Sequence, residues 1–264
     1  MLGTGLVSEF VEQMYAYREY LKQSVTRDLR KRYKRSFLGY LWSMLHPLFM
    51  MLILAVVFAN IMKSGMKDYA VFLFTGMLPW VYFNSTTQGC LGTIRANASL
   101  MDHVSVPKYI FPLSIAWSNL VNFFLSLVPL VIVMLALGRG LPLASLGLPL
   151  VLLPMFFFTV GISLLFAVSN VFFEDTQHLV GVVMQALYYL CPVLYSREML
   201  PEWLVPYVTL NPMFGVIEQM RGMYYEGAMP DVQSYCFNLL GSYLVLVIGL
   251  WVFKRADEKF IYFV

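Results

Sequence analysis

Charge is scarce in this chain, and that scarcity excludes an ordinary soluble domain. Only 12% of the 264 residues are Asp, Glu, Lys or Arg, against roughly 25% in soluble globular domains. Hydrophobic residues make up 59% of the chain, and the mean hydropathy is +0.70. The apolar stretches are continuous rather than alternating, which disfavours a β-barrel. The composition therefore predicts an all-α protein that crosses a membrane several times.

Motifs that would give the chain its own chemistry are also missing. The sequence contains no GxxxxGK[ST], so a P-loop for ATP is excluded. It contains no HExxH, GxSxG or SxxK pattern either. The cysteines and histidines are isolated, so we expect no metal site: Cys90, Cys191, Cys236, His46, His103 and His178. A disulfide between Cys191 and Cys236, near the predicted outer face, remains open.

Ionisable side chains are almost absent from the long apolar stretches. Uncharged amides do occur there: Asn60, Asn84, Asn119, Asn122 and Asn170. Carriers driven by ions or protons, and voltage sensors, place ionisable groups inside the membrane. The sequence therefore argues against both classes. We expect any transport by this chain to be powered by another subunit.

The strongest evidence for a membrane span and its orientation lies between Arg27 and Met62. Six of the nine residues 27–35 are basic, and residues 37–62 carry no Asp, Glu, Lys or Arg. Cationic flanks stay in the cytoplasm, so a first span is expected to run outward from this block. Continuing along the chain predicts six membrane helices with both termini inside, over residues 38–62, 70–92, 111–137, 146–171, 179–194 and 236–253. Inner segments then hold 13 Lys and Arg and outer segments five, as the positive-inside rule requires.

The chain is interpreted as one transmembrane domain. Residues 1–36 form an interface helix and a basic flank, residues 37–253 the six-span bundle, and residues 254–264 a cytoplasmic tail. Apolar residues recur at every third or fourth position of the interface helix, which predicts an amphipathic helix on the cytoplasmic membrane surface: Phe10, Met14, Tyr17, Leu21, Val25 and Leu29. This helix is either a simple anchor or a docking collar for a cytoplasmic partner.

The second predicted span is polar in its second half. Residues Asn84 to Gln88 are five consecutive polar residues. An unpaired polar group in hydrocarbon costs several kcal/mol. This half of the span is therefore expected to face protein or water rather than lipid.

The outer segment 195–234 is too apolar for an ordinary loop and too interrupted for a span. Asn211 followed by Pro212 is a helix start, with an N-cap residue and proline at the first helical position. The short helix that it opens carries Glu218 and Arg221. The pattern predicts re-entrant or interfacial helices between spans five and six.

Two adjacent carboxylates, Glu174 and Asp175, lie at a predicted membrane boundary. One interpretation makes them the general acid and base of an intramembrane enzyme. The other places them at the start of the fifth span, where the helix dipole stabilises negative charge.

Aromatic residues make up 16% of the chain. Their faces suit sugar rings, whose C–H surfaces are apolar while their rims form hydrogen bonds. Ordinary packing and interfacial belts are the alternative. The candidates for a substrate path lie in predicted spans one, two and five: Tyr40, Trp42, Phe72, Phe74, Trp80, Tyr82, Phe83, Tyr188 and Tyr189.

Several motifs, in this order and spacing, resemble ABC-2-type transporter permeases, most closely those that export O-antigen, teichoic acid and related polymers. They cover nearly the whole chain, from about residue 8 to 255: RYKRSFLGYLW at 32–42, LHPL at 45–48, FLFTGMLPW at 72–80, NASL at 97–100, VPK at 106–108, FEDTQH at 173–178, NPM at 211–213 and EQMR at 218–221. One departure is His46, where this family often has Gln.

The resemblance implies a homodimer of six-span subunits in the bacterial inner membrane, joined to two ATP-binding subunits on the cytoplasmic side. ATP and Mg would be held by those partners, with no cofactor on this chain, and a lipid-linked polysaccharide would pass between the protomers. Residues 8–35 would be the interface helix and residues 95–108 the coupling loop. The residues expected to contact the ATP-binding subunit are Arg95, Asn97, Leu100, Asp102, His103, Lys108, Glu174 and Asp175.

The resemblance also assigns the outer segment. Residues 201–222 would be the gate helices, with Trp203, Tyr207, Asn211, Pro212, Glu218 and Arg221 as gate residues. Two alternatives to a polysaccharide exporter stay open: an ABC-2 permease for a drug or lipid, and an intramembrane enzyme using Glu174 and Asp175.

Overall fold

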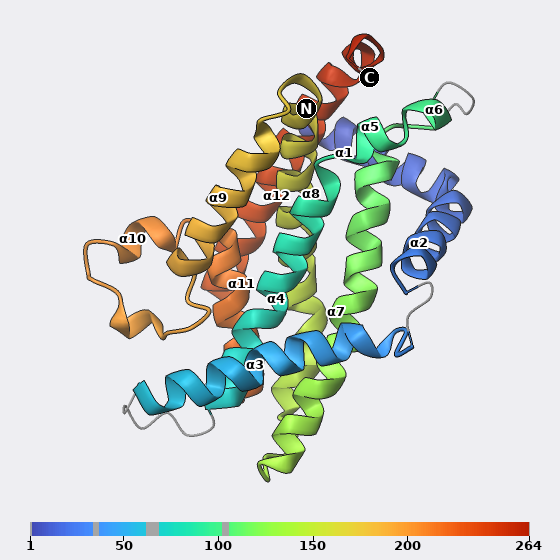
Figure 1. The fold of residues 1–264 in the computed structure, drawn as a ribbon. Coiled ribbons are helices and arrows are strands. Elements are labelled where there is room, and N and C mark those ends of the chain that lie inside the picture. Colours follow the sequence, from blue (N-terminus) through green and yellow to red (C-terminus); the bar gives the residue numbers. More distant parts are fainter. Residues whose placement is uncertain (1, 34–36, 62–68, 102–105, 264) are drawn as a thin grey trace.

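The computed structural model describes residues 2–33, 37–61, 69–101 and 106–263. Within these residues all regular secondary structure is helical, as predicted. Four long helices run side by side and form the body of the molecule (Figure 1): α4 (Tyr69–Cys90), α7 (Ile110–Ala136), α8 (Leu148–Phe172) and α12 (Val232–Ala256).

Three stretches of the described chain are long and apolar enough to cross a membrane: Ile110–Ala136, Leu143–Phe172 and Val232–Phe260. The first is α7, the second joins the short turn η1 (Leu143–Gly147) to α8, and the third joins α12 to η4 (Asp257–Tyr262). A shorter apolar helix covers Leu41–Val57. The structure thus supports a helical membrane protein, and the count of six spans remains a prediction.

Helix α4 lies at the centre and contacts α3, α7, α8, α9 and α11. Every side chain from Val71 to Trp80 is buried. In its polar half, Thr86 and Thr87 are fully buried, and Ser85 is half-buried. The polar half of α4 therefore packs against protein, which confirms the expectation for Asn84 to Gln88.

Helices α8 and α12 approach closely because glycines face each other at their crossing. A Cβ atom on Gly249 would lie 2.5 Å from the carbonyl oxygen of Gly161. A Cβ on Gly161 would lie 2.6 Å from the carbonyl oxygen of Val245. Small residues that let backbones touch are the usual basis of helix packing in membranes.

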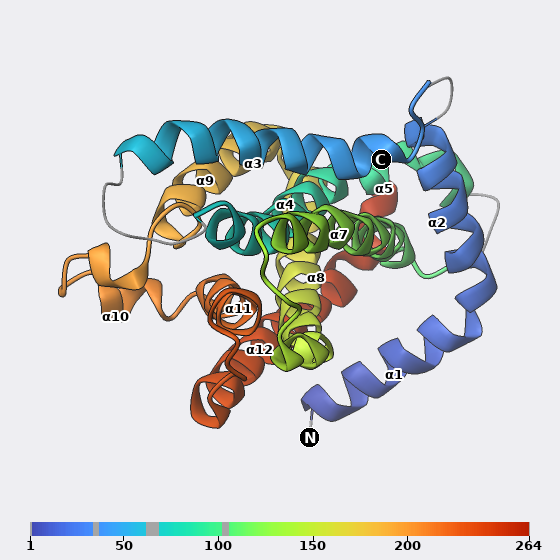
Figure 2. The same cartoon turned by 90° about the horizontal axis from the view of Figure 1, so that it is seen from below.

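Two helices precede the bundle: α1 (Leu2–Ala16) and α2 (Arg18–Tyr33). They correspond to the single amphipathic interface helix predicted from the apolar stripe between Phe10 and Leu29, bent at Tyr17 (Figure 2). Its apolar stripe is confirmed, since Phe10 and Leu21 are buried in a cluster with α7, α8 and α12. The bend lets α1 pack on α12 while α2 packs on α7.

Helix α3 (Leu41–Ile61) corresponds to the first predicted span. It contacts α4 and α7 but lies across them rather than along them (Figures 1 and 2). Phe49, Ile53 and Val56 are exposed on this helix. The apolar helix is confirmed, whereas its role as a span remains a prediction.

The segment after α9 (Thr176–Leu190) confirms the predicted helix start at Asn211. The Asn211 side chain accepts a hydrogen bond from the Met213 amide, and Pro212 opens helix α11 (Pro212–Arg221). Helix α11 packs against α4, α8 and α12 and continues into the turn η3 (Gly222–Glu226). The preceding segment contains only the short turns η2 (Arg197–Met199) and α10 (Val205–Val208).

Candidate functional site

Both termini lie at one end of the bundle, together with the short helices α5 (Thr93–Ala96) and α6 (Ala98–Met101) (Figure 1). We call this the terminal end. The opposite end, which holds η1, η3 and the C-terminus of α7, is called the distal end. Arg95 and Asn97, two of the residues predicted to contact an ATP-binding subunit, fall at the terminal end with α5, and the predicted gate residues Glu218 and Arg221 lie in α11, which leads into η3.

At the terminal end, Arg95 of α5 forms an ion pair with Glu174, 79 residues further along the chain. Its second guanidinium nitrogen donates to the carbonyl oxygen of Val171 at 3.0 Å. The structure thereby brings together the two segments that were predicted separately as cytoplasmic contacts. Glu174 is largely exposed, so the pair lies on the surface of this end.

A second set of polar contacts joins the coupling segment to both termini. Lys108 donates to the backbone carbonyl of Asp257 at 2.6 Å and lies 3.4 Å from its carboxylate. Glu9 of α1 pairs with Lys254 of α12 at 2.5 Å. Tyr109 donates to the side chain of Gln13. The interface helix, the coupling segment and the C-terminal turn therefore form one connected surface.

The remaining predicted contact residues are less tightly placed. Asn97 donates to the carbonyl oxygen of Thr93 at 2.7 Å and separates α5 from α6. Leu100 falls within α6. Asp102 and His103 lie outside the described residues.

The prediction that both carboxylates stabilise the start of the fifth span is only partly right. Asp175 occupies the N-cap position of α9 but makes no capping hydrogen bond. Its backbone is helical, with φ −61° and ψ −16°, rather than in the extended conformation that directs a side chain onto the first amides. Glu174 is turned to Arg95 instead.

Toward the distal end, Arg221 is buried among backbone carbonyls. Its guanidinium donates to Pro192 at 2.6 Å and to Val193 at 3.3 Å. It lies 3.5 Å from the Glu218 carboxylate and covers the ring of Phe72 at 3.6 Å. Burial lowers the pKa of the guanidinium to about 10, so it stays charged at neutral pH. Arg221 thus holds the segment that follows α9 against α11 and α4.

The other predicted gate residues do not join this cluster. Trp203, which precedes α10, and Tyr207, which lies within it, are exposed. Asn211 and Pro212 form the start of α11. The three thiols are free in the structure, with Cys191 buried and Cys236 exposed.

The nine residues of the predicted aromatic path differ in how far they are buried. Five of its members are buried in the subunit core: Phe72, Phe74, Trp80, Tyr82 and Phe83. Their rings pack against neighbours, as when Phe83 stacks on Phe158 with 5.3 Å between centroids. Tyr188 is half-buried against Trp80. Tyr40, Trp42 and Tyr189 are exposed on the surface of the subunit.

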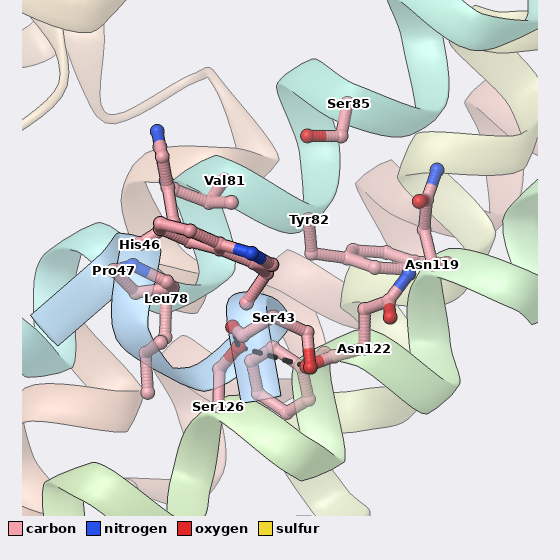
Figure 3. A pocket seen from close by; sticks show the side chains of 12 residues that line it. Ser43, His46, Pro47, Leu78, Val81, Tyr82, Ser85, Asn119, Asn122 and Ser126 are labelled. Atoms are coloured by element: carbon pink, nitrogen blue, oxygen red, sulfur yellow. Dashed lines mark hydrogen bonds between the residues drawn. The ribbon is translucent and has the colours of Figure 1, made fainter. Parts of the chain in front are cut away.

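A pocket of about 370 Å³ lies between α3, α4 and α7 (Figure 3). Side chains of Tyr82, Asn119 and Asn122 converge on it from α4 and α7. The Ser126 hydroxyl closes one side by donating to the carbonyl oxygen of Ser43 at 2.9 Å. Its full lining is Trp42, Ser43, His46, Pro47, Leu78, Val81, Tyr82, Ser85, Asn119, Asn122, Phe123 and Ser126.

Sequence reasoning missed this pocket, although a signal for it was present. Asn119, Asn122 and Ser126 are spaced three and four residues apart, which places them on one face of α7. That face meets the polar half of α4, where Thr86 accepts a hydrogen bond from Asn119 at 3.2 Å. A polar stripe on one predicted span opposite a polar half of another indicates a shared site.

The profile of the ABC-2 type transporter family matches residues 19–225, most of the chain, and the chain belongs to this family. Over 256 residues it is 30% identical to the O-antigen export system permease protein RfbA of Myxococcus xanthus, covering 95% of this chain and 97% of that protein. It is 31% identical to the protein of the same name from Klebsiella pneumoniae, covering 89% and 90%. It is 26% identical to the polysialic acid transport protein KpsM of Escherichia coli, covering 88% and 91%.

Membership of a transporter family decides between two of the sequence interpretations. It favours a transport subunit over an intramembrane enzyme. The structure agrees, since Glu174 is engaged by Arg95 rather than paired with Asp175 as an acid and base.

Proposed function

We propose that this chain is the permease subunit of an ABC exporter that moves a lipid-linked polysaccharide across the bacterial inner membrane. The observation that carries the proposal is similarity along nearly the whole chain to permeases named for O-antigen export. Transport of a drug or another lipid is the less favoured alternative, because the relatives compared are named for polysaccharides.

The proposed subunit has six membrane helices: α3, α4, α7, α8, α9 and α12. Because α3 lies across α4 and α7 in this structure (Figure 1), it would have to turn toward the axis of the bundle to span the membrane. The terminal end faces the cytoplasm. Two observations support this orientation: 13 of the 18 Lys and Arg fall in the segments assigned to the inside, and both termini lie at the same end of the bundle (Figure 1). An even number of spans returns the chain to its starting side.

The working assembly is a homodimer with two ATP-binding subunits docked at the terminal end. ATP and Mg belong to those partners. The docking surface includes α1, α5, α6 and the Arg95–Glu174 pair, where exposed charge is available to a second protein. Glu218 and Arg221 hold the outer helix α11 closed on the bundle.

The exposed aromatics are the best candidates for the glycan path. We expect Tyr189→Ala to lower export at least threefold with little change in the amount of permease in the membrane, because its ring is 60% exposed. Phe74→Ala is expected to lower the amount of permease instead, because it removes a core side chain at a cost of about 3–5 kcal/mol. Quantifying surface polymer and membrane permease in parallel separates the two effects. Equal export in Tyr189→Ala and wild type would mean that this ring has no part in the glycan path and serves ordinary packing.

The proposed function is tested by deleting the gene and complementing it. The deletion is expected to remove the surface polysaccharide while polymer accumulates inside the cell, and the wild-type gene is expected to restore it. Normal surface polysaccharide in the deletion would refute the proposal. Loss of a drug-resistance phenotype with intact polysaccharide would favour the alternative.

A further inference from the structure

A second groove lies between α7 and the two arms of the bent interface helix. Figure 2 shows α1 and α2 meeting at an angle, and α2 packs on α7. The groove has a volume of about 440 Å³ and shares no residue with the pocket between α3, α4 and α7. Its lining is Val11, Met14, Tyr15, Arg18, Leu21, Lys22, Val25, Thr26, Trp117 and Val121.

Most of this lining is apolar and open to the surroundings. Val11, Tyr15, Trp117 and Val121 are all exposed. Apolar side chains gathered at one exposed place mark contact with lipid or with another molecule.

The exposed apolar surface continues along α7 beyond the groove. Exposed residues recur there at steps of three and four, which places them on one face of the helix: Trp117, Val121, Phe124, Val128, Ile132 and Leu135. The stretch from Val121 to Ile132 is about 16 Å long, about half the thickness of the hydrocarbon core of a bilayer. An acyl chain that starts in the groove can therefore follow α7 through one leaflet.

The charge of the groove selects the headgroup. Arg18 and Lys22 lie one turn apart on the same face of α2, and no Asp or Glu lines the groove. Within the described residues, neither cation forms an ion pair. The Arg18 guanidinium lies 4.4 Å from the centre of the Tyr15 ring and donates to the Tyr15 carbonyl oxygen at 3.0 Å, which leaves other N–H donors for a ligand.

A phosphate oxygen is a strong acceptor for both cations. The ammonium of a zwitterionic headgroup would instead lie beside two positive charges with no carboxylate in the lining to receive it. An anionic headgroup that carries acyl chains is therefore the ligand that matches the groove.

We propose that this groove binds one anionic phospholipid. Its phosphate lies between Arg18 and Lys22, and an acyl chain passes Trp117 and Val121 and continues along α7. The lipid is a resident partner of the fold and not the exported substrate, so the site goes beyond the proposed function. It gives the anchor interpretation of the interface helix a defined ligand, which joins this helix to α7.

The test is native mass spectrometry of the full-length permease, purified in detergent and supplied with equal amounts of phosphatidylglycerol and phosphatidylethanolamine that have the same chains. We expect one phosphatidylglycerol to be retained per subunit, with at least a tenfold preference over phosphatidylethanolamine. Arg18→Gln/Lys22→Gln should lower this retention at least tenfold, because two cationic contacts are lost. Glycerol 3-phosphate, which has the phosphate without the chains, should not compete at a hundredfold excess.

Arg27→Gln/Lys31→Gln is the matched control. It removes two exposed cations at the same spacing from the same helix, and neither residue lines the groove. This variant should retain phosphatidylglycerol like wild type, and the thermal unfolding temperature checks that both variants fold.

Four results would overturn the site. Equal retention of the two lipids would remove its selectivity, and equal loss in the two double variants would indicate general attraction to a basic surface. Competition by glycerol 3-phosphate would indicate a phosphate site without a lipid. Loss of the dimer in Arg18→Gln/Lys22→Gln, with lipid retained, would show that a second copy covers the groove. The proposed function would stand in each case, since it fails only if gene deletion spares the surface polysaccharide.

Discussion

The two ends of the bundle are held together in different ways. At the distal half, Arg221 is buried, donates to two carbonyl groups and lies against the Phe72 ring. At the terminal end, the Arg95–Glu174 and Lys254–Glu9 pairs lie at the surface. Buried contacts of the first kind impose one geometry, whereas exposed ion pairs contribute at most about 1 kcal/mol each. The difference indicates a rigid distal half and a terminal end whose charges are able to change partners.

The interior of the bundle is also held by close, buried contacts. The α8–α12 crossing depends on direct backbone contact at Gly161 and Gly249. Because the two backbones touch, a movement of one helix must displace the other. A partner that engages the exposed charges of the terminal end would therefore move a body that deforms little.

Replacing the buried cation should have the largest effect. Arg221→Met leaves the carbonyl oxygens of Pro192 and Val193 without their donor and Glu218 without its partner. We expect a loss of about 3 kcal/mol or more in the free energy of unfolding, seen as a lower thermal unfolding temperature of the purified permease. Arg197→Met, at an exposed arginine, is the control. Equal stability of the two variants would contradict the rigid distal half.

Adding one methyl group at the helix crossing should have the next largest effect. Gly249→Ala places a Cβ 2.5 Å from the Gly161 carbonyl oxygen, so α8 and α12 must separate. Overpacking of this kind costs about 1–3 kcal/mol. Gly181→Ala on α9 is the control, since no atom lies within 4 Å of its added Cβ. Thermal unfolding in nanodiscs measures both, and an unchanged Gly249→Ala would show that the crossing adapts.

The smallest effect on stability, and a large one on coupling, is expected at the terminal end. Arg95→Glu should lower the unfolding free energy by about 1–2 kcal/mol, because Glu174 is exposed and the hydrogen bond from Arg95 to the Val171 carbonyl is only partly buried. It should nevertheless lower stimulation of the partner's ATPase at least threefold. The exchange Arg95→Glu/Glu174→Arg should restore the pair and recover stimulation. Full stimulation in the single variant would mean that this pair plays no part in coupling.

Local signals in the sequence predicted local structure well. Asn211 followed by Pro212 predicted the start of α11, and the stripe through Phe10 and Leu21 predicted which face of the interface helix is buried. Each depends on residues within one or two helical turns. The bend at Tyr17 escaped prediction, because it arises from packing α1 on α12 and α2 on α7.

Contacts between distant segments could not be predicted in the same way. Arg221 and Glu174 were both recognised as candidates, but their partners lie 26–29 and 79 residues away. The aromatic residues of α4 and α9 could not be sorted from the sequence for the same reason. Composition marks Phe74 and Tyr189 as equal candidates for a path, and only the packing separates a core ring from an exposed one.

The central claim is that this chain forms a conduit and that a separate ATP-binding subunit drives it. The most direct test reconstitutes the permease in liposomes with and without the ATP-binding partner and measures translocation of the lipid-linked polysaccharide. Translocation is expected only when the partner, ATP and Mg are all present. Directional transport by the purified permease alone would contradict the claim.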